Sequence, residues 1–418
     1  MNKSWSKMGL AFSAAMLGLT GFAGAQQLAF PGAEGFGRFA TGGRSGAVYH
    51  VTNLNDRGEG SFRDAVSKPN RTVVFDVSGV IKITDKIAAA PKITVAGQTA
   101  PGEGVVVYGN GVSFADSSII RYMRFRGSIT MPRGACTVVA DNCHDVIFDH
   151  VSVSWGRWDN FHIKGTTNIT LQYCLIGEPI DPQRFGALFE DPHNVTISHC
   201  LWIDNQSRNP KAKASIEYIN NVVYNWGGNG LVGGHSGANH FQDVIGNYFI
   251  GGPNSSKSFI SLFTATDHVY QRDNMVDINK DGKLNGRLAT DSDFIHTTAT
   301  VVKQRNFQTN TTIDKPEEAF RKVLAGVGAS QRRDAVDKRI IGYLQSLGKE
   351  GKIFKTEADA GGQPNMEAVT QHADGNNNGI PDAVEGKYLA AGKADATKVN
   401  KDGYTSLEAY LNDLVKAK

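Results

Sequence analysis

The sequence predicts an all-β protein built as a parallel β-helix, with a short N-terminal capping helix and C-terminal helices. Two observations support this. A short apolar, β-rich segment recurs every 21 to 27 residues between about residues 118 and 276, and the runs within each copy are separated by Gly, Asn and Asp without helical periodicity. Each copy is too short to bury its own apolar face, whereas stacked coils form one continuous core. The alternative, a β-propeller, needs longer repeats of about 40 residues.

One position of the repeat is expected to form a ladder of stacked polar side chains. Aligned copies place Asn221, Asn247 and Asn274 at equivalent positions. The same alignment puts His150, Cys174 and Cys200 in this series. Each asparagine amide would bond to its neighbour in the next coil.

Both ends of the solenoid need covers, because the terminal coils would otherwise expose apolar surface. Residues 61–66 read as a short helix with Ser61 as N-cap, suited to the first coil. At the other end, residues 316–328 and 334–347 carry apolar side chains at helical spacing. We expect two helices there, packed on the barrel.

The first 25 residues have the features of a secretory signal. Lys3 and Lys7 precede an apolar run, and residues 23–25, Ala-Gly-Ala, form a small-residue cleavage site. The run is shorter than the roughly 20 apolar residues of a membrane span. We therefore predict a signal peptide over 1–25, a β-helix domain over 26–310 and a C-terminal extension over 311–418, with secretion to the extracellular space or the periplasm.

The composition limits the classes of partner and ligand that the protein is expected to bind. The 418 residues are 40% hydrophobic and 20% charged, with a formal net charge of +3, which is typical of a globular chain and gives no reason to expect nucleic acid or a membrane as partner. The four cysteines are too few for a disulfide scaffold and lack the spacing of a zinc site. We expect a monomer that acts on a polymer.

Two Asx-rich segments resemble calcium loops. Residues 374–382 and 277–282 space oxygen-bearing side chains two apart, as calcium loops do. Asx turns that bind no ion are the commoner outcome of this pattern, and both interpretations stay open.

Charged and aromatic residues concentrate in three consecutive coils, where a β-helix would present them as ladders on a flat outer face. Such a face suits a long unbranched polymer: aromatic rings stack on sugars and cations hold carboxylates. The alternative is that the tryptophans are core residues and the lysines a solvated face. The residues are Trp155, Arg157, Trp158, Asp159, His162, Lys164, Glu178, Arg184, Trp202, Arg208, Lys211 and Lys213.

Several segments carry a specific resemblance to a known family. They are residues 30–37 (FPGAEGFG), 51–56 (VTNLND), 60–65 (GSFRDA), 74–79 (VFDVSG), 96–102 (AGQTAPG), 148–150 (FDH), 154–156 (SWG) and 207–211 (SRNPK). In these segments the chain resembles the bacterial pectate lyases of the first polysaccharide lyase family, over about residues 28–280. The resemblance implies a right-handed parallel β-helix.

The resemblance also implies β-elimination on α-1,4-polygalacturonate. The family base is the arginine of an Arg-x-Pro motif, and Arg208-Asn209-Pro210 matches it. An arginine is ordinarily protonated, so as a base it must be desolvated and crowded by cations such as Lys211 and Lys213. Lys213 stands where the family has a substrate-binding arginine, and it lacks the bidentate fork. With Lys211, Arg184, Trp155 and Arg157 it makes up the expected substrate-binding set.

The family uses Ca²⁺ to neutralise the uronate carboxylate, and here the sequence departs from the pattern. Gly134, Cys136, Trp158 and His162 fall at or near the family's acidic positions, which leaves Asp159 and Glu178 as the expected ligands.

Three alternatives stay open. One is a calcium-independent pectin lyase, or another uronan lyase, with an aromatic-rich cleft. Another is a β-helical hydrolase that uses paired carboxylates such as Asp149 with Asp159 or Glu178. The third is a β-helix that binds polysaccharide without cleaving it.

Overall fold

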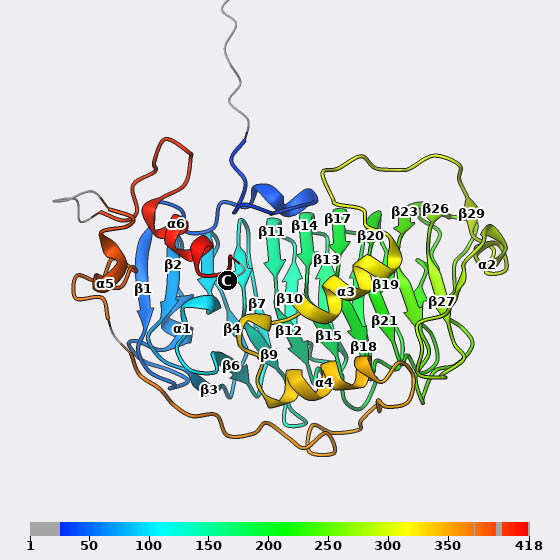
Figure 1. The fold of residues 1–418 in the computed structure, drawn as a ribbon, viewed down its shortest axis with the longest axis horizontal. Coiled ribbons are helices and arrows are strands. Elements are labelled where there is room, and N and C mark those ends of the chain that lie inside the picture. The colour runs from blue at the N-terminus through cyan, green and yellow to red at the C-terminus, as the bar shows by residue number, and fades with distance from the viewer. Residues whose placement is uncertain (1–25, 372, 390–394, 417–418) are drawn as a thin grey trace, which may run out of the picture.

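A computed structural model describes residues 26–371, 373–389 and 395–416, and the predicted signal peptide lies outside them. The chain climbs through stacked coils from the N-terminal end, on the left of Figure 1, to the opposite end, and then runs back along the outside of the solenoid. Within the solenoid, each strand pairs in parallel with its equivalents in the coils before and after it. The predicted parallel β-helix is confirmed.

The strands form three sheets along the solenoid. The first sheet holds β1 (Ala47–Val51), β2 (Arg71–Phe75), β5 (Ile93–Ala96), β8 (Ile119–Arg121), β11 (His144–Asp149), β14 (Thr167–Gln172), β17 (His193–Ser198), β20 (Ile216–Ile219), β23 (His240–Ile245), β26 (Asp267–Arg272) and β29 (Thr300–Val301). The second holds β3 (Gly79–Lys82), β6 (Val105–Tyr108), β9 (Arg124–Arg126), β12 (Ser152–Ser154), β15 (Leu175–Gly177), β18 (Leu201–Ile203), β21 (Val222–Tyr224), β24 (Tyr248–Ile250), β27 (Met275–Asp277) and the antiparallel β28 (Arg287–Leu288). The third holds β4 (Ile87–Ala88), β7 (Val112–Ser113), β10 (Val138–Asp141), β13 (Asp159–Lys164), β16 (Phe185–Glu190), β19 (Lys211–Lys213), β22 (Leu231–Val232) and β25 (Ile260–Ser261).

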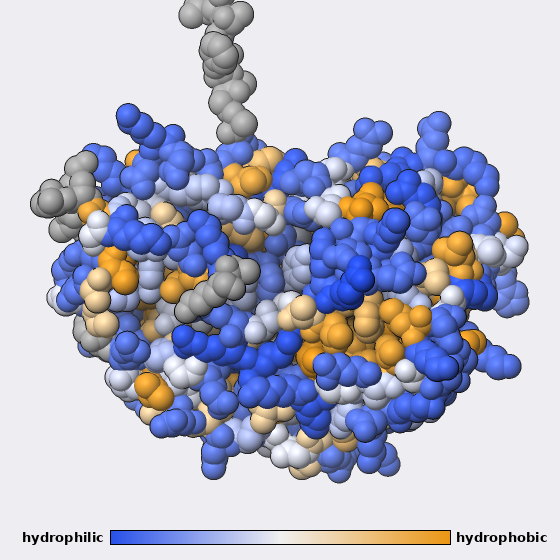
Figure 2. Space-filling view, in the orientation of Figure 1, coloured by the Kyte–Doolittle hydropathy of each residue, from blue (hydrophilic) through white to orange (hydrophobic). Residues whose placement is uncertain are grey.

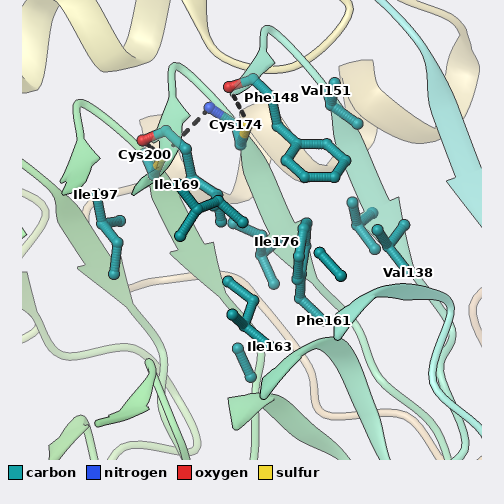
Figure 3. Packing of buried hydrophobic residues seen from close by; sticks show 14 of the residues in the cluster. Val138, Phe148, Val151, Phe161, Ile163, Ile169, Cys174, Ile176, Ile197 and Cys200 are labelled. Carbon is teal, nitrogen blue, oxygen red and sulfur yellow. Dashed lines mark hydrogen bonds between the residues drawn. The ribbon is translucent and has the colours of Figure 1, made fainter. Parts of the chain in front are cut away.

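Inward side chains from all three sheets fill a single apolar interior. Figure 3 shows Phe148, Phe161 and Ile176, which come from different sheets, pointing toward one another. All three are fully buried. Because every coil contributes to the same core, the outward side chains of each sheet are left to form the surface.

The polar ladder is present, with one correction. The Asn221 backbone N–H and side-chain amide both donate to Oδ1 of Asn247, at 2.8 and 3.1 Å. Asn247 in turn donates to Oδ1 of Asn274 at 2.9 Å. The Cys200 N–H donates to Asn221 at 2.9 Å, so the ladder extends to the cysteines, which are free thiols.

His150 does not belong to this ladder. Asp149 pairs with Gln172, which puts the buried Val151 opposite Cys174 and shifts His150 by one residue. The His150 ring instead stacks between Tyr122 and Tyr173, at centroid distances of 4.6 and 4.9 Å. A slip of one residue moves a side chain to the other face of its strand, which explains the error.

The helices form at the predicted residues, but the C-terminal pair packs along the side of the solenoid and does not cover its far end as expected (Figure 1). The capping helix α1 (Phe62–Ala65) begins after Ser61, whose hydroxyl accepts from the Asp64 N–H. The helices α3 (Pro316–Gly326) and α4 (Ala335–Gln345) bury an apolar face against the second sheet. The short helix α2 (Asp291–Ile295) lies beside the last strand, β29. Three short 3-10 turns complete the set: η1 (Phe36–Phe39), η2 (Gly97–Thr99) and η3 (Ser330–Arg332).

The C-terminal segment returns to the N-terminal coils. The helices α5 (Asp382–Glu385) and α6 (Ser406–Asp413) lie beside β1 and β2 (Figure 1), where Leu407 and Leu411 pack against Val74. Figure 2 shows apolar side chains gathered between α3 and α4. Among the described residues, no helix has the length and apolar character needed to cross a membrane. The helices α3 and α4 cover the second sheet. The predicted residues Arg208, Lys211 and Lys213 lie on or just before β19, which belongs to the third sheet.

Candidate active site

The candidate site lies on the outer face of the third sheet. Strand register aligns His162 with Leu188 and Leu188 with Lys211, across β13, β16 and β19. Two residues further along the same strands, Lys164, Glu190 and Lys213 form the next row. The parallel pairing therefore brings together charged residues that are about 50 positions apart in sequence.

Arg208 is held rigidly just before β19. Its backbone has a positive φ of 62°, and its carbonyl accepts from the Ala187 N–H at 2.9 Å. The following residue, Asn209, is fully buried, and its side chain accepts from the Asn205 amide at 2.7 Å. The carbonyl of Asn209 accepts from the Tyr218 hydroxyl at 2.9 Å. A fixed backbone limits the directions in which the guanidinium can point.

The Arg208 guanidinium lies between a carboxylate and an aromatic ring. Its Nη1 donates to both carboxylate oxygens of Asp159, at 3.0 and 3.2 Å. The guanidinium carbon lies 4.1 Å from the centroid of the Phe185 ring. The Arg208 side chain keeps 17% of its surface exposed, whereas that of Asp159 is fully buried. Burial raises the pKa of Asp159 to about 6, against the opposing effect of Arg208 and His162.

Lys211 and Lys213 extend the cationic surface beside Arg208. Lys213 pairs with Glu190 at 3.5 Å. Lys211 forms no ion pair within the part of the chain that the structure describes, and it lies half-buried. Burial together with the nearby charges of Arg208 and Lys213 lowers the pKa of Lys211. Lys211 is thus a cation of this face with which no described carboxylate is paired.

His162 lies between two carboxylates on the neighbouring strands. Its Nδ1 is 2.9 Å from Asp141, and its Nε2 is 3.7 Å from Glu190. Burial disfavours the imidazolium, but the hydrogen bond with Asp141 and the charges of Asp141, Asp159 and Glu190 outweigh burial and raise the pKa of His162. An alternating row of charges therefore runs from β10 to β19.

Two predicted binding residues serve the turns at the edge of this face. Arg157 donates to the backbone carbonyls of Met131 and Asp181, at 2.7 and 3.1 Å. Arg184 pairs with Asp181 at 3.1 Å and keeps 29% of its side chain exposed. Arg157 thereby links two loops beside the site.

Two of the predicted site residues are misplaced by the sequence interpretation. Trp155 and Glu178 are fully buried on the second-sheet side, where the indole N–H donates to Glu178 at 3.2 Å. Glu178 is paired with Arg339 of α4, which covers it. Trp155 therefore cannot stack on a sugar and Glu178 cannot ligate calcium beside Asp159. Trp202 is also fully buried, in the core.

The sequence interpretation also missed three residues of the site: Phe185, Glu190 and Asp141. Glu190 and Lys213 occupy the same position of successive coils, and this repeat spacing was the signal that could have identified Glu190. Asp141 and Phe185 emerge only from the stacking of β10, β13 and β16.

The donor set does not fit a resident calcium ion. Ca²⁺ takes six to eight oxygen ligands, mostly carboxylates and carbonyls. Each carboxylate of this face already has a cation of the chain beside it: Asp159 has Arg208, Asp141 has His162 and Glu190 has Lys213. Among the described residues, no group of three or more His, Cys, Asp or Glu side chains is arranged to hold a metal ion.

The paired carboxylates of a hydrolase are not assembled either. Asp149 is buried on the first sheet and pairs with Arg121 at 2.8 Å. Asp159 belongs to the third sheet and Glu178 lies under α4. In none of the pairs proposed from sequence do both carboxylates lie on the same face of the solenoid.

Curated relatives cover almost the whole chain. It is 43% identical over 395 residues to a probable pectate lyase C of Aspergillus flavus, with 93% of this chain and 94% of the relative covered. The probable pectate lyases C of Aspergillus fumigatus and Emericella nidulans are 44% and 42% identical, over 93% of this chain and 94% and 93% of the relatives. No protein-family model matches the chain.

Solved structures support the fold alone, because their sequence identity is low. A Bacillus subtilis pectate lyase aligns with a TM-score of 0.57 at 12% identity, covering 74% of this chain and 99% of that one. A thermostable pectate lyase aligns with a TM-score of 0.55 at 11% identity, covering 74% and 99%.

A parallel β-helix with a cationic outer face and these relatives defines the chain as a polysaccharide lyase. Within that class, the chain belongs to the pectate lyase family. The Aspergillus and Emericella relatives are fungal, so they do not support the bacterial branch that the motifs suggested.

Proposed function

We propose that the chain cleaves α-1,4-polygalacturonate by β-elimination on the outer face of the third sheet, with Arg208 as the base. The observation that carries the proposal is the fixed Arg208 guanidinium beside Lys211 and Lys213 on an exposed sheet face. The proposal includes a secreted location and action as a monomer, in keeping with the predicted leader.

In the proposed reaction, the C–H bond next to the uronate carboxylate breaks and its proton passes to the neutral guanidine of Arg208. The electron pair of that bond forms a carbon–carbon double bond as the glycosidic C–O bond breaks. The departing oxygen takes a proton from water. Products are an unsaturated uronide and a shortened chain.

The base must first lose its own proton. An ion pair with Asp159 at 3.0 Å holds the guanidinium, and Lys211 and Lys213 lie on the same face. Substrate that draws Arg208 away from Asp159 would therefore promote catalysis. Arg184 and Arg157 lie at the edge of the third-sheet face, where Arg184 can contact neighbouring uronates.

The charge of the face favours pectate over methylated pectin. A pectin lyase would need an aromatic-rich, uncharged cleft, and the burial of Trp155 and Trp202 removes two of its expected aromatic residues. Lys211 and Lys213 match the carboxylates of de-esterified polymer.

The test is the ultraviolet absorbance of the unsaturated product when polygalacturonate is added. Arg208→Lys should lower turnover by at least about a hundredfold, because the ammonium cannot reproduce the position of the guanidine, while substrate binding changes only a few fold. Arg272→Lys, on the first sheet, is the matched control and should keep full turnover. An Arg208→Lys enzyme with most of its activity would assign the base elsewhere. Reducing ends without absorbance would indicate a hydrolase, and tight binding without turnover a binding protein.

A further inference from the structure

Strands β10, β13, β16 and β19, with Arg208 just before β19, carry eight charged or titratable groups, and their ion pairs leave two of the five cations without a partner among the described residues. The cationic groups are Arg208, Lys211, Lys213, Lys164 and His162, which lies between two carboxylates, and the carboxylates are Asp141, Asp159 and Glu190. Three ion pairs account for every carboxylate and for three of the cations. Lys164 and Lys211 remain: Lys164 is exposed to solvent, whereas Lys211 is half-buried beside Arg208 and Lys213.

A divalent ion and a uronate carboxylate would affect this balance in opposite ways. An added Ca²⁺ would raise the excess positive charge and would have to displace Arg208, His162 or Lys213 from its carboxylate before it gained ligands. A uronate carboxylate, with one negative charge, compensates the half-buried Lys211 without breaking any pair. Charges that are partly buried are stable only when they are compensated, so the face suits the anion.

The position of Lys211 also suits the proposed reaction. Lys211 follows Arg208 by three residues, and its strand stacks on β16, whose first residue, Phe185, lies under the guanidinium. A carboxylate held by the ammonium would therefore lie beside the base. The negative charge that spreads into this carboxylate during C–H cleavage would then meet a fixed cation.

We propose that the Lys211 ammonium, supported by Lys213, binds and neutralises the uronate carboxylate at the reacting sugar, so that the enzyme works without calcium. This inference rests on the proposed lyase function and replaces the metal that the family resemblance implied. Lys211 acts directly on the substrate and is thus a catalytic residue in the strict sense.

The experiment uses the full secreted chain, freed of metal with a chelator. Turnover of polygalacturonate in excess EGTA should stay within about twofold of turnover in millimolar Ca²⁺. Trigalacturonate should bind in EGTA, with an affinity that falls as salt is raised, as measured by calorimetry. A loss of tenfold or more in EGTA that Ca²⁺ restores would overturn the inference while leaving the lyase function intact.

Two variants of Lys211 distinguish the effect of its positive charge from the effect of its side-chain size. Lys211→Met should weaken trigalacturonate binding and lower kcat/KM by about 10- to 100-fold. Added Ca²⁺ should not restore the activity of this variant. Lys211→Arg, which keeps the charge, should retain most of the binding and of kcat/KM. Lys82→Met, an exposed lysine on β3 of the second sheet, is the control and should change both by less than twofold. Thermal melting of each variant identifies a folding defect.

The binding measurement decides the inference even if no uronan is cleaved. Absent turnover with and without Ca²⁺ would contradict the proposed function. Trigalacturonate binding in EGTA that Lys211→Met abolishes would still support the role of Lys211 as the carboxylate ligand. Binding that requires Ca²⁺, or that Lys211→Met leaves unchanged, would overturn it.

Discussion

Arg208 and Asp159 form the central ion pair of the candidate site, and the sequence did not predict that they are paired. The Arg-x-Pro motif by itself predicts Arg208 as the candidate base. Asp159 was expected to ligate a metal, but its carboxylate accepts both hydrogen bonds from the guanidinium. Their separation of 49 residues is bridged by stacked coils, and no local pattern encodes that contact.

The buried Asp159 makes stability depend on pH. Its folded pKa of about 6 lies above the unfolded value of 3.8, so its contribution to stability is fully present below pH 3.8 and is lost as the pH rises through 6. The free energy of unfolding of Asp159→Asn, relative to that of the wild type, should therefore rise by up to about 3 kcal/mol between pH 4 and pH 7. Urea unfolding at both pH values measures this. Asp181→Asn, with 40% of the side chain exposed, should show a smaller change. An equal difference from wild type at both pH values would contradict the assignment.

Among the elements, α4 is anchored to the solenoid by a buried ionic network. Arg126 of β9 donates to both oxygens of Asp334, at 2.7 and 2.9 Å, and to Asp337 at 2.9 Å. Asp334 is also the N-cap of α4, accepting from the Asp337 N–H. Helical spacing predicted α4 and its apolar face, whereas the arginines that hold it come from a strand about 200 residues earlier.

Asp334→Ala should destabilise the protein by about 3–5 kcal/mol, because it leaves the fully buried Arg126 charge without its bidentate partner and removes a helix cap. The free energy of unfolding in urea checks this value. Glu318→Gln, in an exposed pair with Arg321 on α3, is the control and should cost less than about 1 kcal/mol. A loss below about 1 kcal/mol for Asp334→Ala would show that the network contributes little.

Across the solenoid as a unit, the coils are coupled by the asparagine ladder and by the shared core. Asn247 links its neighbours on both sides, accepting from the Asn221 N–H and donating to Asn274 and to the Tyr218 carbonyl. In a solenoid, stability is set by the coils and by the contacts between neighbours. Substitution of one asparagine of the ladder should therefore destabilise the coils on either side of it.

Asn247→Ala should lower the free energy of unfolding by about 2–4 kcal/mol, since it leaves the buried Asn221 N–H and the Tyr218 carbonyl without partners. Hydrogen exchange should accelerate most in β20, β23 and β26. Asn239→Ala, an exposed residue just before β23, is the control and should leave exchange unchanged. Uniform acceleration over all coils would contradict coupling between neighbours.

Periodicity, capping residues and short motifs are local signals, and they were enough to predict the parallel β-helix, the capping helix α1, the helices α3 and α4 and the asparagine ladder. Which charged residues meet depended on the packing of the coils and helices. That packing buried Trp155 and Glu178 under α4, moved His150 out of the ladder and paired Asp159 with Arg208. Coil length sets how side chains stack between turns, and a difference of one residue changes the face on which each of them lies.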